Sequence, residues 1–254
     1  MAEPALHLVK VPLRTAKLVD VARGRGISIR ELDDGYLAHC ILRELWQDRS
    51  PAPFVLRGRG RTLEVWGYSR ANAEALVRHA RDFGDPSLLG VLDDMSAIAS
   101  KPIPCLRTGQ RVGFVLRACP VVRLSKGRAG HRAGAEVDAF LARCFALGSD
   151  ATVSREDVYR EWLSARLGEP ERCGVAIERI AVAGFARERL VRRTHGESRQ
   201  AKRLERPDVR FEGDFVVADG RRFLEFLARG VGRHRAFGFG ALLVVPPGTS
   251  YPRG

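Results

Sequence analysis

Two residues near the N-terminus have the types and the spacing for proton transfer. Tyr36 and His39 lie three positions apart in a stretch where Leu37, Ile41 and Leu45 recur at four-residue spacing. That period predicts a helix with one buried apolar face, and residues three apart are neighbours on its surface. A histidine away from the core titrates near neutral pH and can exchange a proton with a substrate. Taken alone, such a pair is more often a surface feature than a catalytic one.

A glycine-rich basic segment, residues 229–245, could hold an anion. Its four glycines enclose three basic or titratable side chains: Gly230, Gly232, Arg233, His234, Arg235, Gly238 and Gly240. Glycine permits a positive φ and lets a ligand backbone approach closely. Because a predicted helix precedes the glycines and a strand follows them, the order is opposite to that of a dinucleotide-binding motif. Two interpretations remain, a loop that contacts a nucleic-acid backbone or a helix C-cap followed by a turn.

The charge balance indicates a polyanionic partner. The chain has 254 residues, with 43 lysines and arginines against 30 acidic residues, and a formal net charge of +13 at pH 7. Nearly all the cations are arginine, whose planar guanidinium suits phosphate and base edges. A genome rich in G and C also raises the arginine content, so charge alone does not establish nucleic-acid binding.

Residues 186–210 concentrate this charge in a predicted β-hairpin arm. They hold eight arginines and one lysine against four acidic residues. A two-stranded basic ribbon can enter a nucleic-acid groove. The alternative is a solvated loop, and the density of arginine favours contact with RNA.

The elements that would position these residues follow a ferredoxin-like order twice. In the first half, we expect strands over 6–13, 54–57, 62–68 and 95–100, and helices over 35–46 and 70–83. In the second half, we expect strands over 110–120, 175–185, 209–217 and 241–245, and helices over 135–145, from 155, and over 220–229. The sequence therefore predicts an α+β protein with two tandem ferredoxin-like (RRM-like) domains, residues 1–104 and 109–254.

A basic, glycine-containing loop is predicted over residues 21–30, before the helix that carries His39. It is either a solvated connection or an RNA contact through Arg23 and Arg25. Asp33 and Asp34 follow, and we expect them to be favourable charges at the N-terminus of that helix.

Several classes of protein are disfavoured by the sequence. No apolar run approaches the roughly 20 residues of a membrane helix, and the first residues lack a signal-peptide pattern. We therefore expect a cytoplasmic protein without a membrane partner. The five cysteines are widely spaced and form no Cys-x-x-Cys pair, so we expect neither a metal site nor a cofactor.

Together, these segments resemble the CRISPR repeat-RNA-processing endoribonucleases, most closely the CasE branch of type I-E systems. Residues 230–243 are similar to the glycine-rich loop of that family, and 36–39 to its Tyr-x-x-His on the first helix. Residues 111–123 resemble its central Leu-Arg-Ala-Asn-Pro strand, although Cys119 stands where the family usually has asparagine. The loop has His234 and Arg235 near the usual lysine. A divergent relative, such as the processing nuclease of a type IV system, would fit these departures.

The resemblance implies binding of a CRISPR repeat RNA hairpin, metal-independent cleavage at its base to give guide RNAs, and association with the other subunits of an effector complex. It implies that His39 is the catalytic histidine with Tyr36 beside it, and we add Arg23 as a phosphate clamp. We expect RNA contacts from the basic residues of the loops, the central strand and the arm, and from two loop glycines: Arg25, Arg43, Arg107, Arg111, Arg187, Arg189, Arg192, Arg193, Arg199, Lys202, Arg203, Gly230, Gly232, Arg233, His234 and Arg235.

Two other functions compete with this interpretation. A non-catalytic RNA-hairpin-binding subunit of a ribonucleoprotein complex would need the same basic groove, so the sequence does not separate it from a nuclease. A small-molecule enzyme on a ferredoxin-like scaffold is disfavoured by the net charge of +13 and the arginine-rich arm.

Overall fold

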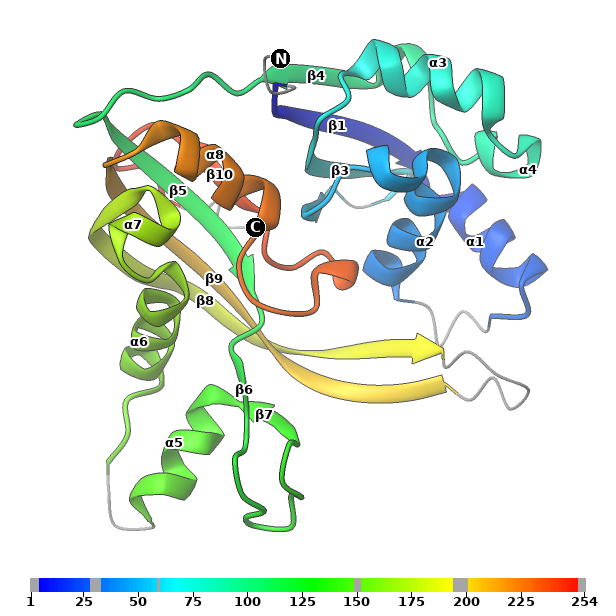
Figure 1. Ribbon diagram of the computed structural model, residues 1–254. Helices are drawn as coiled ribbons and strands as arrows, with labels where there is room; N and C mark the ends of the chain where they lie inside the picture. Colours follow the sequence, from blue (N-terminus) through cyan, green and yellow to red (C-terminus); the bar gives the residue numbers. More distant parts are fainter. Residues whose placement is uncertain (1–4, 28–32, 59, 149–151, 194–200, 251–254) are drawn as a thin grey trace.

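Two four-stranded antiparallel sheets, one from each half of the chain, form the framework of the protein (Figure 1). The structure is a computed structural model that describes residues 5–27, 33–58, 60–148, 152–193 and 201–250. For residues 192–193 and 201–203 it describes the backbone only.

The N-terminal sheet has the strand order β2-β3-β1-β4, which is the ferredoxin-like order. Its strands are β1 (His7–Arg14), β2 (Phe54–Arg57), β3 (Thr62–Ser69) and β4 (Ala99–Pro102). The accompanying helices are α1 (Thr15–Gly24), α2 (Asp34–Trp46), α3 (Ala73–Phe83) and α4 (Pro86–Leu89), with short 3₁₀ turns η2 (Gln47–Arg49) and η3 (Met95–Ala97).

The C-terminal sheet repeats this arrangement with the order β10-β5-β9-β8. Its strands are β5 (Arg111–Ala118), β8 (Val175–Arg193), β9 (Ala201–Val217) and β10 (Leu242–Val245). Its helices are α5 (Ala139–Leu147), α6 (Arg155–Leu167), α7 (Pro170–Cys173) and α8 (Gly220–Arg229), with the turn η4 (Arg235–Phe237). The predicted α+β class with two ferredoxin-like domains is confirmed, whereas the exact division into 1–104 and 109–254 stays a prediction.

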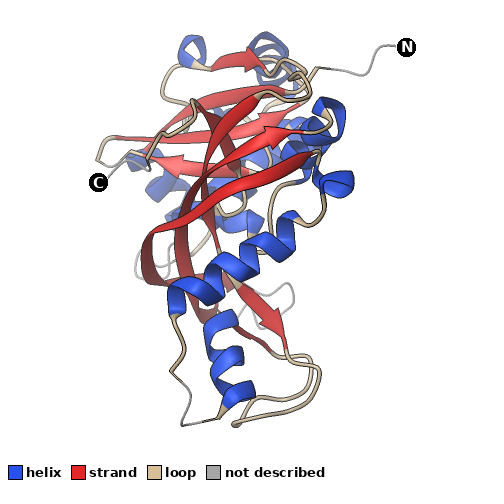
Figure 2. Ribbon diagram, turned by 90° about the vertical axis from the view of Figure 1, so that its left-hand side faces the viewer, coloured by secondary structure: helices blue, strands red, loops and turns tan. Residues whose placement is uncertain are grey.

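A small hairpin inserted after β5 was absent from the expected elements. It pairs β6 (Val121–Arg123) with β7 (Glu136–Asp138), and with α5 it projects from one end of the molecule (Figures 1 and 2). The helix expected over 135–145 was placed too early. Asp138 accepts a hydrogen bond from the backbone N–H of Phe140 at 2.8 Å, so the helix begins at Ala139.

Two further expectations in the N-terminal half need correction. The predicted basic loop begins too early, because α1 continues to Gly24 and the turn comes only at Arg25 and Gly26. The closing strand, expected over 95–100, is a 3₁₀ turn followed by β4 at Ala99–Pro102.

The predicted β-hairpin arm is confirmed in the described part of β8 and β9. Their pairing runs from Val175 opposite Val217 to Arg193 opposite Ala201, with register shifts near 177–179 and 182–184. In Figure 1 the far part of this yellow hairpin passes beneath α2. The backbone N–H of Val191 donates a hydrogen bond of 3.4 Å to Asp33, which precedes α2, so the arm touches the helix that carries His39.

The two halves are joined by shared packing and by hydrogen bonds. Leu6, Val55 and Tyr68 from the N-terminal half are buried in the core of the C-terminal sheet. The hydroxyl of Tyr68 donates to the carbonyl of Leu242 at 2.7 Å. Helix α2 contacts η4, in the segment after α8 that lies between the two sheets (Figure 1). The glycine-rich loop therefore lies beside the helix that carries His39.

Candidate functional site

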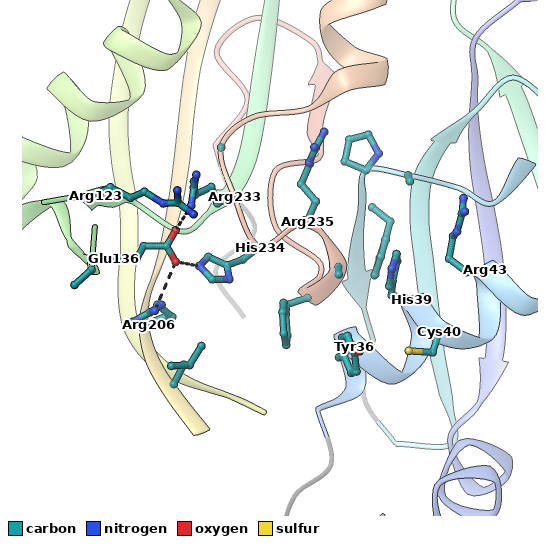
Figure 3. Close-up of a pocket in the computed structure, with 18 of the residues that line it drawn as sticks. Tyr36, His39, Cys40, Arg43, Arg123, Glu136, Arg206, Arg233, His234 and Arg235 are labelled. Atoms are coloured by element: carbon teal, nitrogen blue, oxygen red, sulfur yellow. Dashed lines mark hydrogen bonds and ion pairs between the residues drawn. The ribbon is translucent and has the colours of Figure 1, made fainter. Parts of the chain in front are cut away.

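A cleft of 1560 Å³ opens where α2, the glycine-rich loop, the β6–β7 hairpin and the arm meet. Among the residues that line it are six arginines and three histidines, against two glutamates: Arg43, Arg123, Arg132, Arg206, Arg233, Arg235, His39, His131, His234, Glu44 and Glu136. Figure 3 shows α2 on one side of this cleft and Glu136 on the other, with the loop between them. The surplus of guanidinium groups suits a polyanionic guest.

Helix α2 presents Tyr36 and His39 to the cleft because its other face is held in the core. Leu37, Ile41 and Leu45 are buried, as their spacing predicts. Tyr36 stacks on Phe237 with 5.3 Å between ring centroids, and its centroid lies 6.4 Å from that of His39. The predicted neighbours therefore share one wall of the cleft.

The imidazole of His39 is mostly neutral near pH 7, because its pKa is lowered. Partial burial, and then the positive charge of Arg43, lower the pKa of His39 below its ordinary value of 6.5. A neutral imidazole can accept a proton, which is the property a general base needs. The neighbouring thiol does not compete for this role, because burial raises the pKa of Cys40.

The glycine-rich loop contains the helix C-cap that its sequence allowed, while its contact with a nucleic-acid backbone stays a prediction. Gly230 has φ 73° and caps α8, with its N–H bonded to the carbonyl of Phe226. A Cβ at Gly230 would lie 2.6 Å from Cγ of Pro53, so only glycine fits there without a shift. Beyond this cap, residues 232–237 line the cleft. The C-cap and the part that lines the cleft are thus successive parts of one segment.

A carboxylate opposite α2 is contacted by two guanidinium groups and an imidazole from two segments. Glu136 accepts a hydrogen bond of 2.8 Å from Arg233 at Oε1, and its Oε2 lies 2.8 Å from Nε2 of His234 and 3.6 Å from Arg206. These partners, led by His234, lower the pKa of Glu136 to about 2 despite its burial. The residue is therefore ionised throughout the physiological range.

The other predicted site residues are distributed as follows. Arg43 lines the cleft, and Arg23 and Arg25 do not. Arg23 is exposed in the last turn of α1, and Arg25 pairs with both oxygens of Glu44 at 2.8 and 2.7 Å. The structure therefore does not bring Arg23 or Arg25 into the cleft with His39, and their roles stay predictions.

The arginines predicted as RNA contacts in the central strand and the arm do not line this cleft where the structure describes their side chains. Arg107 is exposed before β5, Arg111 pairs with Glu178 at 2.6 Å, Arg187 pairs with Glu205 at 3.1 Å, and Arg189 is exposed. Arg199 and the side chains of four further arm residues lie outside the described part of the structure: Arg192, Arg193, Lys202 and Arg203. Contacts from the arm to RNA thus remain predictions.

Sequence reasoning missed much of the cleft wall opposite α2. Arg123, His131, Arg132 and Glu136 belong to the small hairpin and its loop, and Arg206 was counted only as part of the arm. The run of basic residues between 123 and 132 is the one signal that could have drawn attention to this wall.

Within the described residues, no group of three or more histidine, cysteine, aspartate and glutamate side chains could hold a metal ion. Over the same residues, no helix has the length and apolar character needed to cross a membrane.

Asp33 should give the folding stability an inverse dependence on pH. It caps α2 by accepting from the N–H of Tyr36 at 2.9 Å, and burial raises the pKa of Asp33 from 3.8 to about 6. Between these values the folded chain retains a proton that the unfolded chain has lost, so stability falls as pH rises through this window. Asp33→Asn keeps the cap and removes the titration, so the variant gains stability relative to wild type as pH rises from 3.8 to about 6.

Urea unfolding of wild type and of Asp33→Asn across this pH range tests the expectation. Asp94→Asn is the matched control, because Asp94 caps the exposed turn η3 and its hydrogen bonds with Ser96 lower the pKa of Asp94. Relative to wild type, Asp94→Asn should lose a little stability as pH rises through this window, whereas Asp33→Asn should gain stability. If the free energy of unfolding depends on pH in the same way for wild type and Asp33→Asn, the role of Asp33 is contradicted.

Tandem ferredoxin-like domains around an arginine-lined cleft define an α+β protein suited to a polyanionic ligand. The particular family follows from comparison with known proteins. The chain belongs to the CRISPR associated protein family, whose sequence profile matches residues 6–246. No curated protein sequence matches the chain.

Solved structures of CRISPR proteins share this fold. A CRISPR endoribonuclease Cse3 bound to 19 nt RNA is 25% identical, with a TM-score of 0.59, and the match covers 95% of this chain and 100% of that one. Thermus thermophilus Cse3, bound to an RNA representing a pre-cleavage complex, is 23% identical with a TM-score of 0.56 and coverage of 95% and 100%. A chain of a CRISPR RNA-guided surveillance complex, pre-nicking, is 17% identical with a TM-score of 0.52 and coverage of 95% and 99%. The resemblance drawn from the motifs is thus confirmed.

Proposed function

We propose that this chain is an endoribonuclease that binds the stem-loop of CRISPR repeat RNA and cleaves the precursor into guide RNAs. The observation that carries the proposal is the position of His39, whose pKa is lowered, on the wall of a cleft lined by arginines. The structural likeness to Cse3 bound to a 19 nt RNA, at 25% identity, supports RNA as the polyanion.

The reaction proposed for this cleft is an internal transesterification. The 2′-hydroxyl of the nucleotide before the cut attacks its own 3′-phosphate, and its proton passes to the imidazole of His39. The bond to the 5′-oxygen breaks, and this oxygen takes a proton from the imidazolium or from water. The products are a 2′,3′-cyclic phosphate and a 5′-hydroxyl, so the chemistry itself needs no metal ion. A well-placed histidine contributes typically 10²–10⁴-fold to such a rate.

Neighbouring groups have supporting roles in this proposal. Tyr36 orients the reacting nucleotide, because its stacking on Phe237 limits its own movement. The guanidinium groups of the cleft stabilise the charge that develops on the phosphate. Arg23 would act as a phosphate clamp only if RNA binding brought it closer to the cleft, which it does not line.

We further propose that the arm enters a groove of the hairpin, and that the chain stays on its product as a subunit of an effector complex in the cytoplasm. The described part of the arm runs next to α2, which supports joint recognition of one RNA by the arm and the cleft. The division into domains 1–104 and 109–254 belongs to this proposal, with the cleft between the two units.

A cleavage assay separates this function from its alternative, a non-catalytic RNA-hairpin-binding subunit. The wild-type chain would be incubated in EDTA with the repeat RNA of the CRISPR array in its own genome, and with unrelated stem-loops. Cleavage at the base of the repeat hairpin is expected. Tight binding without cleavage in any buffer would favour the alternative.

RNA binding should depend strongly on salt and on the arm. With a net charge of +13, affinity for the stem-loop is expected to fall by more than about 10-fold between about 50 and 200 mM salt. Replacing Arg192 and Arg193 by alanine should weaken binding of the hairpin more than binding of unstructured RNA, and reduce the salt slope by about two. Fluorescence anisotropy with a labelled stem-loop measures both effects.

The double variant Arg78→Ala and Arg81→Ala is the matched control for this experiment. It removes the same charge from the exposed side of α3, which Figure 1 shows far from the arm. A flat salt profile, or equal losses from the two double variants, would contradict RNA binding by the arm.

A further inference from the structure

The carboxylate of Glu136 lies in the wall of the cleft opposite α2, in contact with nitrogen atoms of three side chains. Its Oε1 is bonded to Arg233, and its Oε2 lies within 2.8 Å of His234 and 3.6 Å of Arg206. These groups come from β7, the glycine-rich loop and β9, so three separate segments build the contact. In Figure 3 the dashed lines converge on this single carboxylate.

The surroundings of Glu136 hold more positive charge than one carboxylate neutralises. Two guanidinium groups and an imidazole meet it, and Nε of Arg206 is buried with no hydrogen-bond partner among the described residues. The side chains of Glu136, Arg206 and His234 are only 13–15% exposed. A backbone phosphate carries one negative charge on two terminal oxygens, as a carboxylate does, so it can replace Glu136 against these donors.

The backbone of His234 has an unusual conformation in this contact. His234 has φ 60° and ψ 28°, the left-handed region that non-glycine residues rarely adopt. Such a conformation persists when the surrounding contacts enforce it, and such contacts are typical of binding sites. The contact with Glu136 is one of them.

This position differs from that of His39. Three successive ring contacts separate the two histidines, with centroid distances of 6.4 Å for His39–Tyr36, 5.3 Å for Tyr36–Phe237 and 6.0 Å for Phe237–His234. An RNA strand crossing the cleft could therefore place one phosphate beside His39 and a different phosphate beside His234.

We propose that Arg206, Arg233 and His234 form a site for a backbone phosphate of RNA next to the cleavage point, and that Glu136 fills this site until the RNA displaces it. The inference rests on the proposed function, because it takes RNA as the guest. Glu136 also lines a neighbouring hollow of 220 Å³ together with Arg155 and Arg187. The displaced carboxylate can turn toward these two arginines.

Glu136→Gln tests the displacement directly. The substitution retains the size of the side chain and removes the charge with which the phosphate competes. Binding is measured with a stem-loop that carries a 2′-deoxy nucleotide at the cut, so that cleavage does not enter the result. We expect Glu136→Gln to bind this RNA about 10-fold more tightly than wild type at the same salt concentration, because the phosphate no longer has to displace a carboxylate.

Glu161→Gln is the matched control, because it removes one negative charge from an exposed pair with Arg143 outside the cleft. A gain for Glu136→Gln that does not exceed the gain for Glu161→Gln overturns the inference. Weaker binding by Glu136→Gln also overturns it, since Glu136 would then be a structural anchor of the loop.

A scan of the RNA makes the test independent of that variant. Each phosphate near the cut is replaced in turn by an uncharged methylphosphonate. At one position the replacement should cost wild type about 10-fold in affinity, and this cost should vanish in Arg233→Ala, whose side chain is 46% exposed and tolerates truncation. A scan with no position that depends on Arg233 overturns the phosphate site. If the wild-type chain binds no stem-loop at all, the proposed function fails as well.

Discussion

Replacing His39 by alanine is expected to slow RNA cleavage by about 10²-fold or more, while affinity for an uncleavable stem-loop stays nearly unchanged. The reason is that the imidazole acts on the proton of the attacking hydroxyl in the transition state and contributes little to binding of the ground state. Single-turnover rates with excess protein, together with anisotropy titrations, separate these two effects.

A second histidine serves as the control for this variant. His79 lies on α3, where its ring contacts Phe83, and it does not line the cleft. His79→Ala should cut RNA at the wild-type rate. If His39→Ala also cuts at that rate, His39 is only a surface histidine, and the chemistry moves to the arginines that line the cleft, with Arg43 tested first.

Gly35→Ala is expected to abolish most cleavage although Gly35 touches no RNA in this account. A Cβ at Gly35 would lie 2.5 Å from the carbonyl oxygen and 2.6 Å from the carbonyl carbon of Phe237, which is backbone of η4. Helix α2 and the glycine-rich loop must then separate, and Tyr36 and His39 move with the helix. Such overpacking costs roughly 1–3 kcal/mol of stability. Even an ångström of displacement at a catalytic group can cost about 10²-fold in rate.

The other helical glycine of the same domain provides the comparison. A Cβ at Gly24, in the last turn of α1, would meet nothing within 4 Å. Gly24→Ala should therefore be neutral, or stabilise the chain by up to about 1 kcal/mol, and should leave cleavage intact. Thermal unfolding and cleavage rates of both variants check the contrast. Equal behaviour of the two would show that close packing of α2 on η4 is unimportant.

The sequence predicts most of the fold because the apolar periods are strong where the helices and strands are buried. Leu37, Ile41 and Leu45 identified α2, and the order of the elements predicted both sheets. Helix α1 was missed because its N-cap, Arg14, makes no capping side-chain hydrogen bond and only Leu18 and Ala22 are buried. The glycines at its end dominated the local pattern and predicted a loop.

The site was predictable only where its residues are close in the sequence. Tyr36 and His39 share one helix, and the loop arginines follow its glycines, so local spacing pointed to both groups. Glu136 and His234 are 98 positions apart, and their contact depends on how the β6–β7 hairpin folds against the loop. No local pattern encodes such a pairing, and the same holds for Arg206, which comes from the arm.

The most direct test of the proposed reaction uses the RNA rather than the protein. A stem-loop with a single 2′-deoxy nucleotide at the cut is compared in EDTA with the all-ribose RNA, and the ends of the products are identified by mass spectrometry. Attack by the 2′-hydroxyl predicts that the deoxy RNA remains intact. The ribose RNA should give a 2′,3′-cyclic phosphate or a 3′-phosphate on one fragment and a 5′-hydroxyl on the other. Cleavage of the deoxy RNA, or fragments that end in a 3′-hydroxyl and a 5′-phosphate, would contradict the account.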